Sequence, residues 1–201
     1  APYAHDIGSN GMGAAVADIN NDGHLDLLVA AISHPSASNH SRIWSDPTTA
    51  FLNQGNGTFE VPSTNSGIPF NEGDIDAGLV DFDNDGRLDL SLTRDPKYEA
   101  NYDTADQYAW FGLLWASEQG EFESVGLFSG INVDIETGTD AGKKRQMKGG
   151  QNHAWADIDH DGDQDLLIGG RDQGGGRPNF LYTNDLGQDN RWIALSLRGD
   201  G

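Results

Sequence analysis

The chain has 201 residues, a formal net charge of −20 and no cysteine, which excludes disulfide frameworks and cysteine-based zinc or thiol chemistry. The acidity disfavours nucleic acid as a partner, because phosphate backbones bind basic surfaces, and no apolar run is long enough to span a bilayer. Hydrophobic residues make up 36% of the chain and 27 residues are glycine, which favours a turn-rich, all-β protein over a helical one.

The first predicted elements are a strand near Met12–Ala17, the acidic nonapeptide Asp18–Asp26 and a second strand near Leu25–Ala31. The nonapeptide fits the pattern D-x-[DN]-x-D-G-x-x-D, and the pattern recurs at Asp81–Asp89 and Asp157–Asp165. Short apolar runs flank each copy, and those that follow are rich in strand-forming residues. Each nonapeptide is therefore predicted to connect two strands.

The alternating acidic positions of the nonapeptide are typical of a calcium loop. Calcium takes roughly 6–8 oxygen ligands, and a tight loop can aim the side-chain oxygens of positions 1, 3 and 5 at one point. Glycine at position 6 permits the sharp turn, position 7 offers its backbone carbonyl, and the ninth aspartate replaces the Glu that an EF-hand carries at position 12. The predicted ligands are Asp18, Asn20, Asp22, His24 (carbonyl) and Asp26; Asp81, Asp83, Asp85, Arg87 (carbonyl) and Asp89; and Asp157, Asp159, Asp161, Asp163 (carbonyl) and Asp165.

The alternative to metal binding is three Asx-rich turns with solvated carboxylates. Two carboxylates about 4 Å apart repel by roughly 4 kcal/mol at an effective dielectric of 20, so several converging carboxylates would destabilise each loop without a cation. Magnesium fits less well, because it demands near-octahedral geometry and retains its waters. We expect about three Ca²⁺ sites, and such loops fill where calcium is near millimolar, which places the protein outside the cell, at its surface or in a periplasm.

Two hairpins are predicted between the acidic stretches. Phe51–Phe59 closes around an Asn/Gly-rich turn, and Leu114–Phe122 repeats the arrangement without the Asn-x-Gly pattern. Farther along, Lys143–Arg145 and Lys148 form the only basic cluster. This cluster is either a solvated loop or a contact for an acidic neighbour, such as another copy of the protein.

The third acidic stretch is followed by a predicted strand at Asn179–Thr183 and an alternating strand at Asn190–Leu197. We predict a single domain, 1–201, with repeats at about 12–62, 75–126 and 151–198. Repeats of about four strands are typical of a β-propeller, and propellers close with roughly 4–8 blades. Three blades would leave two apolar faces open, so either the chain is part of a longer polypeptide or other chains complete the propeller.

Three stretches resemble FG-GAP/VCBS repeats, the calcium-binding blades of integrin-α-like propellers: Ala15–Ala30, Gly78–Thr93 and Ala154–Gly170. The hairpin Phe51–Phe59 resembles the Asn-x-Gly-x-Gly-x-Phe stretch of such blades. Phe180–Asn184 with Asn190–Leu195 resembles the junction with the ASPIC/UnbV segment of cartilage-acidic-protein-like chains. The resemblance implies a propeller of about seven blades, an extracellular or surface location, roles in adhesion and ligand binding, and the calcium ligands named above.

These observations predict a secreted or cell-surface interaction or adhesion module that binds a protein or glycan and uses calcium structurally. One alternative is a lectin, in which exposed aromatic residues stack on sugars; the candidates are Trp44, Tyr98, Tyr102, Tyr108 and Trp110. Another is a structural protein that assembles from copies of itself. An enzyme is not expected, because no Ser/His/Asp arrangement or HExxH motif is visible, although the chain could be the non-catalytic part of a larger enzyme.

Overall fold

The computed structural model describes residues 10–32, 47–71, 73–94, 111–118, 120–125, 131, 135–136, 144–145, 150–170 and 179–185. These residues are all-β, as predicted, and they form three small antiparallel sheets, none of which closes on itself. A short ladder joins β9 (Ile135–Glu136) to β10 (Lys144–Arg145), and η1 (Asn65–Gly67) is a single 3-10 turn. In the described part of the chain, no helix has the length and apolar character needed to cross a membrane.

Each sheet is a meander in which strands that follow one another in the chain pair antiparallel. The first sheet contains β1 (Asn10–Ala17), β2 (Asp26–Ile32), β3 (Thr49–Asn53) and β4 (Phe59–Glu60). The second contains β5 (Asp74–Val80), β6 (Asp89–Arg94), β7 (Phe111–Ala116) and β8 (Phe122–Ser124). The third contains β11 (Gly150–Ala156), β12 (Asp165–Gly170) and β13 (Phe180–Tyr182).

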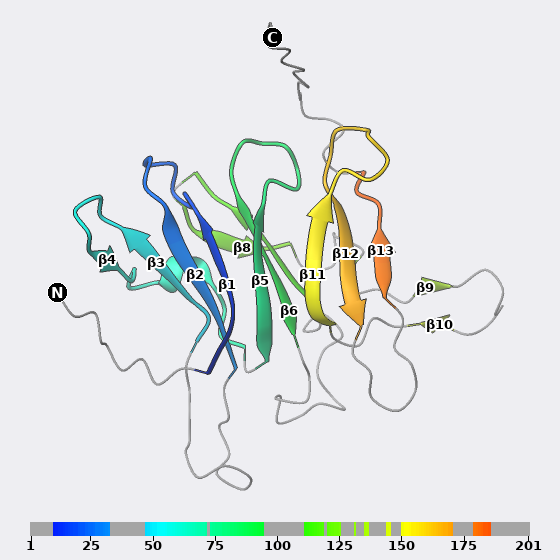
Figure 1. Cartoon of the computed structure of the whole chain (residues 1–201), viewed down its shortest axis with the longest axis horizontal. Coiled ribbons are helices and arrows are strands. Elements are labelled where there is room, and N and C mark those ends of the chain that lie inside the picture. The colour runs from blue at the N-terminus through cyan, green and yellow to red at the C-terminus, as the bar shows by residue number, and fades with distance from the viewer. Residues whose placement is uncertain are drawn as a thin grey trace, which may run out of the picture.

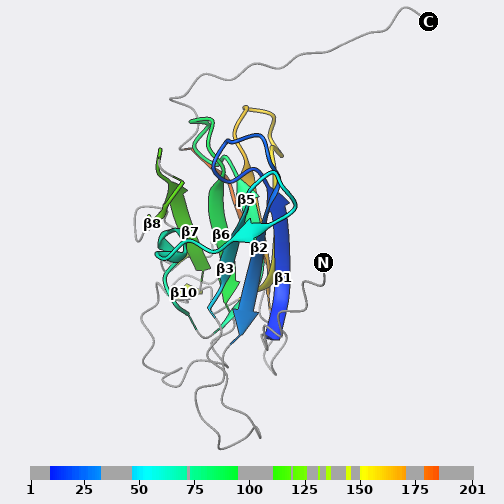
Figure 2. The ribbon, with the colours of Figure 1, turned by 90° about the vertical axis from the view of Figure 1, so that its left-hand side faces the viewer.

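The second sheet lies between the other two (Figure 1), and Figure 2 shows the strands of the first sheet from its free side. The connections from β1 to β2, from β5 to β6 and from β11 to β12 lie at the same end of the molecule (Figure 1). Each of these connections is one of the acidic nonapeptides. The predicted strand–loop–strand arrangement is therefore present three times.

Two hydrophobic clusters hold the sheets together. The first lies between the first and second sheets and includes Leu28, Ala30, Leu90, Leu92 and Leu114. The second lies between the second and third sheets and includes Val80, Phe111, Leu113, Leu166 and Ile168. Strand β6 is buried along its whole length because it has a cluster on both sides, whereas exposed residues occur in β2 and β12.

A buried ion pair adds a polar link between the first two sheets. The Arg94 Nε donates to Asp74 at 2.9 Å, and the Thr48 hydroxyl donates to the other carboxylate oxygen at 2.6 Å. Asp74 is fully buried, and this burial raises the pKa of its carboxyl although the Arg94 charge opposes the shift. Removing either Asp74 or Arg94 would leave the other charge buried and uncompensated, which is strongly destabilising.

Both predicted hairpins are confirmed, as β3–β4 and β7–β8. Their turns close through backbone hydrogen bonds from Gln54 to Thr58 (2.9 Å) and from Ser117 to Glu121 (2.7 Å). Of the basic cluster, the structure describes only the backbone of β10. The other predictions that lie outside the described residues are the strand Asn190–Leu197, Lys143, Lys148, Trp44, Tyr98, Tyr102, Tyr108 and Trp110.

Candidate metal centres

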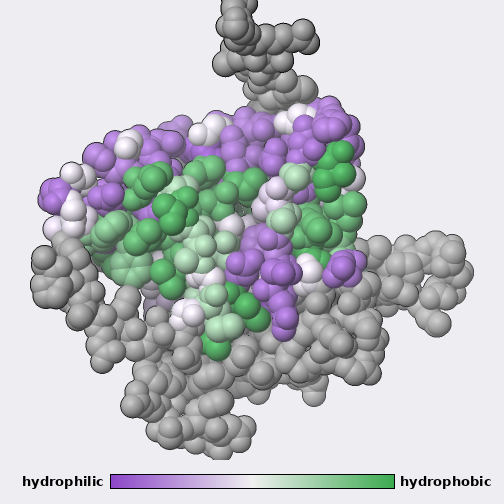
Figure 3. Space-filling view, viewed as in Figure 1, coloured by the Kyte–Doolittle hydropathy of each residue, from purple (hydrophilic) through white to green (hydrophobic). Residues whose placement is uncertain are grey.

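Three loops at one end of the molecule carry the predicted ligands: loop 1 (Asp18–Asp26), loop 2 (Asp81–Asp89) and loop 3 (Asp157–Asp165). A band of hydrophilic side chains follows this end (Figure 3). In each loop, the fourth and sixth residues have positive φ. The fourth residues are Asn21 (57°), Asn84 (58°) and His160 (64°), and the sixth are Gly23 (87°), Gly86 (91°) and Gly162 (102°). A left-handed backbone favours Gly and Asn, which occupy both positions in loops 1 and 2, whereas loop 3 has the same backbone conformation with His160 at the fourth position.

The first aspartate of loops 1 and 2 stabilises that turn. Asp18 accepts the backbone N–H groups of the fifth and sixth loop residues at 3.0 and 2.8 Å. Asp81 accepts the corresponding two N–H groups at 2.9 Å each. These bonds reach four and five residues along the chain and hold each carboxylate pointing into its loop. The Asx turns considered from the sequence are formed by the third and fifth residues of these two loops, whose side chains accept the N–H groups two residues on.

The ninth aspartate of every loop is buried and bonded to the backbone on two sides. The three residues are Asp26, Asp89 and Asp165, with 0%, 1% and 1% exposure. In loops 1, 2 and 3, one carboxylate oxygen accepts the N–H of the second loop residue at 2.8, 3.3 and 2.9 Å. The other accepts the N–H of Asn53, Ala116 and Asn184 at 2.7, 2.8 and 3.0 Å. This aspartate therefore ties the loop to the third strand of its sheet or to the segment just after it.

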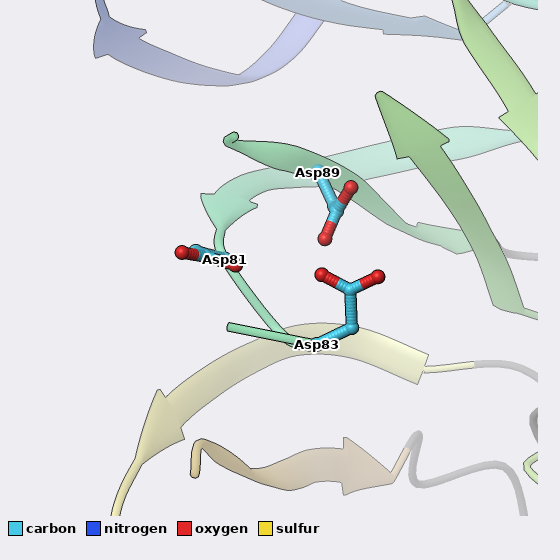
Figure 4. Close-up of side chains that lie close together, drawn as sticks. All are labelled: Asp81, Asp83 and Asp89. Atoms are coloured by element: carbon cyan, nitrogen blue, oxygen red, sulfur yellow. The ribbon is translucent and has the colours of Figure 1, made fainter. Parts of the chain in front are cut away.

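Two of the loops bring three carboxylates together. The clusters are Asp81, Asp83 and Asp89 in loop 2, and Asp157, Asp159 and Asp165 in loop 3. In each cluster, carboxylate oxygens of the three residues lie within 4.8 Å of one another, so either cluster could hold a metal ion. In Figure 4, Asp83 and Asp89 face one another, with Asp81 beside them.

Crowding and burial disfavour the charged form of several of these carboxyls. Burial raises the pKa of Asp89 to about 7, and burial together with the charge of Asp85 raises the pKa of Asp83. In loop 3, desolvation and the neighbouring Asp161 raise the pKa of Asp163 to about 7, and the pKa of Asp159 is also raised. A bound cation would favour the charged forms and oppose these shifts.

Loop 3 contains carboxylate oxygens that no donor in the described part of the chain satisfies. Asp157 Oδ1 and both oxygens of Asp163 are buried without a hydrogen-bond partner. A buried acceptor left without a partner costs about 1–3 kcal/mol, and more when it is charged. The arrangement fits a divalent cation, because a hard cation binds several oxygen ligands at once.

Loop 1 differs from the other two by an amide at the third position. The side chain of Asn20 accepts the N–H of Asp22 at 3.2 Å, and its Nδ2 donates to the Asp22 carboxylate at 3.1 Å. Among the described residues, loop 1 forms no cluster of three carboxylates. Cation binding there stays a prediction from its common pattern.

The seventh residue was predicted to supply a carbonyl ligand, and its side chain differs among the loops. The imidazole of His24 lies over Gly55, where a Cβ would come within 2.3 Å of Nε2. The Arg87 guanidinium donates to the Ala116 carbonyl at 3.0 Å and pairs with Asp85, itself a predicted ligand. Asp163 is the only acidic residue at this position, so loop 3 has five carboxylates and no neutralising arginine.

The structure also brings together a Ser/His/Asp set that was not found in the sequence. His153 Nε2 lies 2.7 Å from the Ser91 hydroxyl, and its Nδ1 lies 3.2 Å from Asp76. Trp155 Nε1 donates to the same hydroxyl at 3.0 Å. Ser91 has no exposed surface, and burial lowers the pKa of His153. These side chains therefore join the second and third sheets, and the hydroxyl is closed to a substrate. Their separation along the chain left no local signal.

A comparison of the chain with models of known protein families and with curated protein sequences finds no match.

Proposed function

We propose that loops 1, 2 and 3 each bind one Ca²⁺ and that the protein is a non-enzymatic, calcium-stabilised interaction module acting outside the cell. The observation that carries the proposal is the set of unsatisfied oxygens on Asp157 and Asp163 beside the carboxylate cluster of loop 3. Calcium suits an irregular set of carboxylates and carbonyls better than magnesium does, because its coordination number and geometry are more variable.

In this proposal the metal has a structural role. Each loop connects the first two strands of a sheet, and its ninth aspartate is bonded to the third strand or the segment after it. A cation would therefore fix three segments of chain at one point, and its binding free energy would add to the stability of the folded state. The calcium requirement supports an extracellular or cell-surface location.

The sheets are proposed to be blades of the propeller type. The common meander order, the acidic connection at the same place and the face-to-face stacking of successive sheets support this assignment. The ligand of the module is proposed to be a protein or a glycan. The buried position of Ser91 supports binding rather than catalysis.

The test is calorimetric titration of chelator-stripped protein with CaCl₂, with MgCl₂ as the competing cation. We expect about three calcium sites, weaker magnesium binding and a large fall in Tm on chelation. The variant Asp83→Asn should remove one site, and Glu60→Gln, on β4 and outside the loops, should remove none. No binding heat together with an unchanged melt would refute the proposal.

A further inference from the structure

Corresponding positions of the three sheets define two faces. Each ninth aspartate begins the second strand of its sheet, so positions can be counted from it. Face A carries Val16, Leu27 and Val29 in the first sheet, Leu79, Leu90 and Leu92 in the second, and Trp155, Leu166 and Ile168 in the third. Face B carries Leu28 and Ala30, then Ser91 and Thr93, then Leu167 and Gly169.

Within the chain, face A always packs on face B of the preceding sheet. Leu28 and Ala30 of the first sheet share a cluster with Leu90 and Leu92 of the second. Ser91 on face B of the second sheet contacts His153 and Trp155 on face A of the third. The same A-on-B contact therefore occurs twice.

Among the described sheets, the stack ends with one face of each kind that no further sheet covers. On face A of the first sheet, Val16 is 59% exposed and Leu27 is 36% exposed, and Phe51 extends the same face beside Leu27. On face B of the third sheet, Leu167 is 44% exposed and Leu181, its partner across the strands, is 56% exposed. On the side of the molecule seen in Figure 3, hydrophobic side chains gather over the first sheet and over the third sheet.

Among the described strand residues, the exposed side chains of both unused faces are uncharged, although the chain has 32 acidic residues and 12 Lys or Arg. Ala14, Val16, Leu27, Val29 and Phe51 make up much of one face. Ala154, Leu167 and Leu181 make up the other. An exposed apolar patch within a polar surface marks an interaction site. If these two faces packed on each other, the apolar residues named here would meet other apolar residues and not carboxylates.

We propose that the unused face A of one copy packs on the unused face B of a second copy, so that the chain associates head to tail. A second copy is the expected partner, because both sheet-to-sheet contacts within the chain place face A on face B. A contact of this heterologous kind gives a closed ring or an open filament, depending on its rotation. The proposal does not require the loops to bind calcium.

The test uses one blocking substitution on each face, Val16→Asp and Leu181→Asp, and measures molar mass by light scattering over a dilution series in calcium. The unchanged chain is expected to show species of two or more copies. Each variant alone should be monomeric, because it has only one usable face. An equimolar mixture should form a 1:1 dimer and nothing larger. The control Phe70→Asp, at an exposed apolar residue outside the strands that form both faces, should associate like the unchanged chain.

Three outcomes would overturn the proposal. They are an unchanged chain that stays monomeric at every concentration, a mixture of the two variants that stays monomeric, and Leu181→Asp alone forming dimers through face A. Circular dichroism verifies folding of each variant. If an aspartate prevents folding, the milder pair Val16→Thr and Leu181→Thr repeats the measurement with the same expected pattern.

Discussion

Loops 2 and 3 have the same backbone turn but use their first aspartate differently. In loop 2, Asp81 accepts two N–H groups from its own loop, and Arg87 neutralises part of the charge. In loop 3, Asp157 Oδ1 and the carboxylate of Asp163 have no hydrogen-bond partner among the residues that the structure describes. The common pattern therefore sets the shape of the loop, while the residues within it determine how strongly the loop depends on a cation.

The largest expected effect is loss of a feature that both loops share. Asp89→Ala would leave the N–H groups of Phe82 and Ala116 without their acceptor in a buried place. At about 1–3 kcal/mol for each unsatisfied group, we expect a loss of about 3 kcal/mol in unfolding free energy. Urea unfolding should show the loss with and without calcium. Asp89→Asn, which keeps one acceptor oxygen, should lose less; an equal or smaller loss for the alanine variant would contradict the role assigned to Asp89.

The contrast between the loops predicts that, in the presence of chelator, neutralising Asp81 and neutralising Asp163 change the stability of the folded chain in opposite directions. Asp81→Asn should lower stability by about 1 kcal/mol, because the amide can accept only one of the two N–H groups at full strength. Asp163→Asn should raise stability by about 1 kcal/mol or more, because it removes a buried charge without a partner. Thermal melts of the two variants at neutral pH give the comparison. Destabilisation by both would show that Asp163 has a donor in the folded protein.

The raised pKa of Asp163 predicts that the stability of the folded chain depends on pH through this carboxyl. The carboxyl binds its proton more tightly when folded, so its contribution to stability is fully present below its ordinary pKa of 3.8 and is lost as pH rises through about 7. In chelator, the Tm of the unchanged chain should therefore fall relative to that of Asp163→Asn over this range. Saturating calcium should reduce the difference. A constant difference between the two proteins at all pH values would contradict the shift.

The smallest expected effect concerns the contact between the two loops. Asn84 Nδ2 of loop 2 donates to the carbonyl of Gly162 in loop 3 at 3.1 Å. Asn84→Gly keeps the left-handed backbone and removes the amide, so calcium binding at loop 3 should weaken by about 0.5–1.5 kcal/mol. Asn21→Gly makes the same change at the same position of loop 1 and should leave loop 3 unchanged. Equal effects of both on loop 3 in a calcium titration would argue against a direct link.

The sequence predicted what depends on neighbouring residues. Glycine at the sixth position and the strand-forming residues around it indicated strand–loop–strand units, and Phe51–Phe59 indicated a hairpin, because these signals lie within a few residues of one another. The ninth aspartates were predicted only as ligands. That Asp26 also bonds Asn53 could not be derived, since the two residues meet only after the sheet has formed.

Contacts between sheets were beyond local patterns for the same reason. Ser91 and His153 are 62 positions apart and come from different sheets. The buried pair of Asp74 and Arg94 depends on the pairing of β5 with β6. Asp163 was expected to act through its carbonyl, and its buried carboxylate follows from packing that the nonapeptide alone does not specify.

The polar contact at Ser91 has a consequence for the order of the sheets. At the equivalent position, the first and third sheets carry Leu28 and Leu167, so only the second sheet presents a hydroxyl there. His153 and Trp155 hydrogen-bond to that hydroxyl. If the first sheet packed there instead, its equivalent residues Ala14 and Val16 would leave the buried hydroxyl without a hydrogen-bond partner. Ser91 therefore favours packing of the second sheet on the third sheet over packing on a sheet that lacks these hydrogen-bond partners.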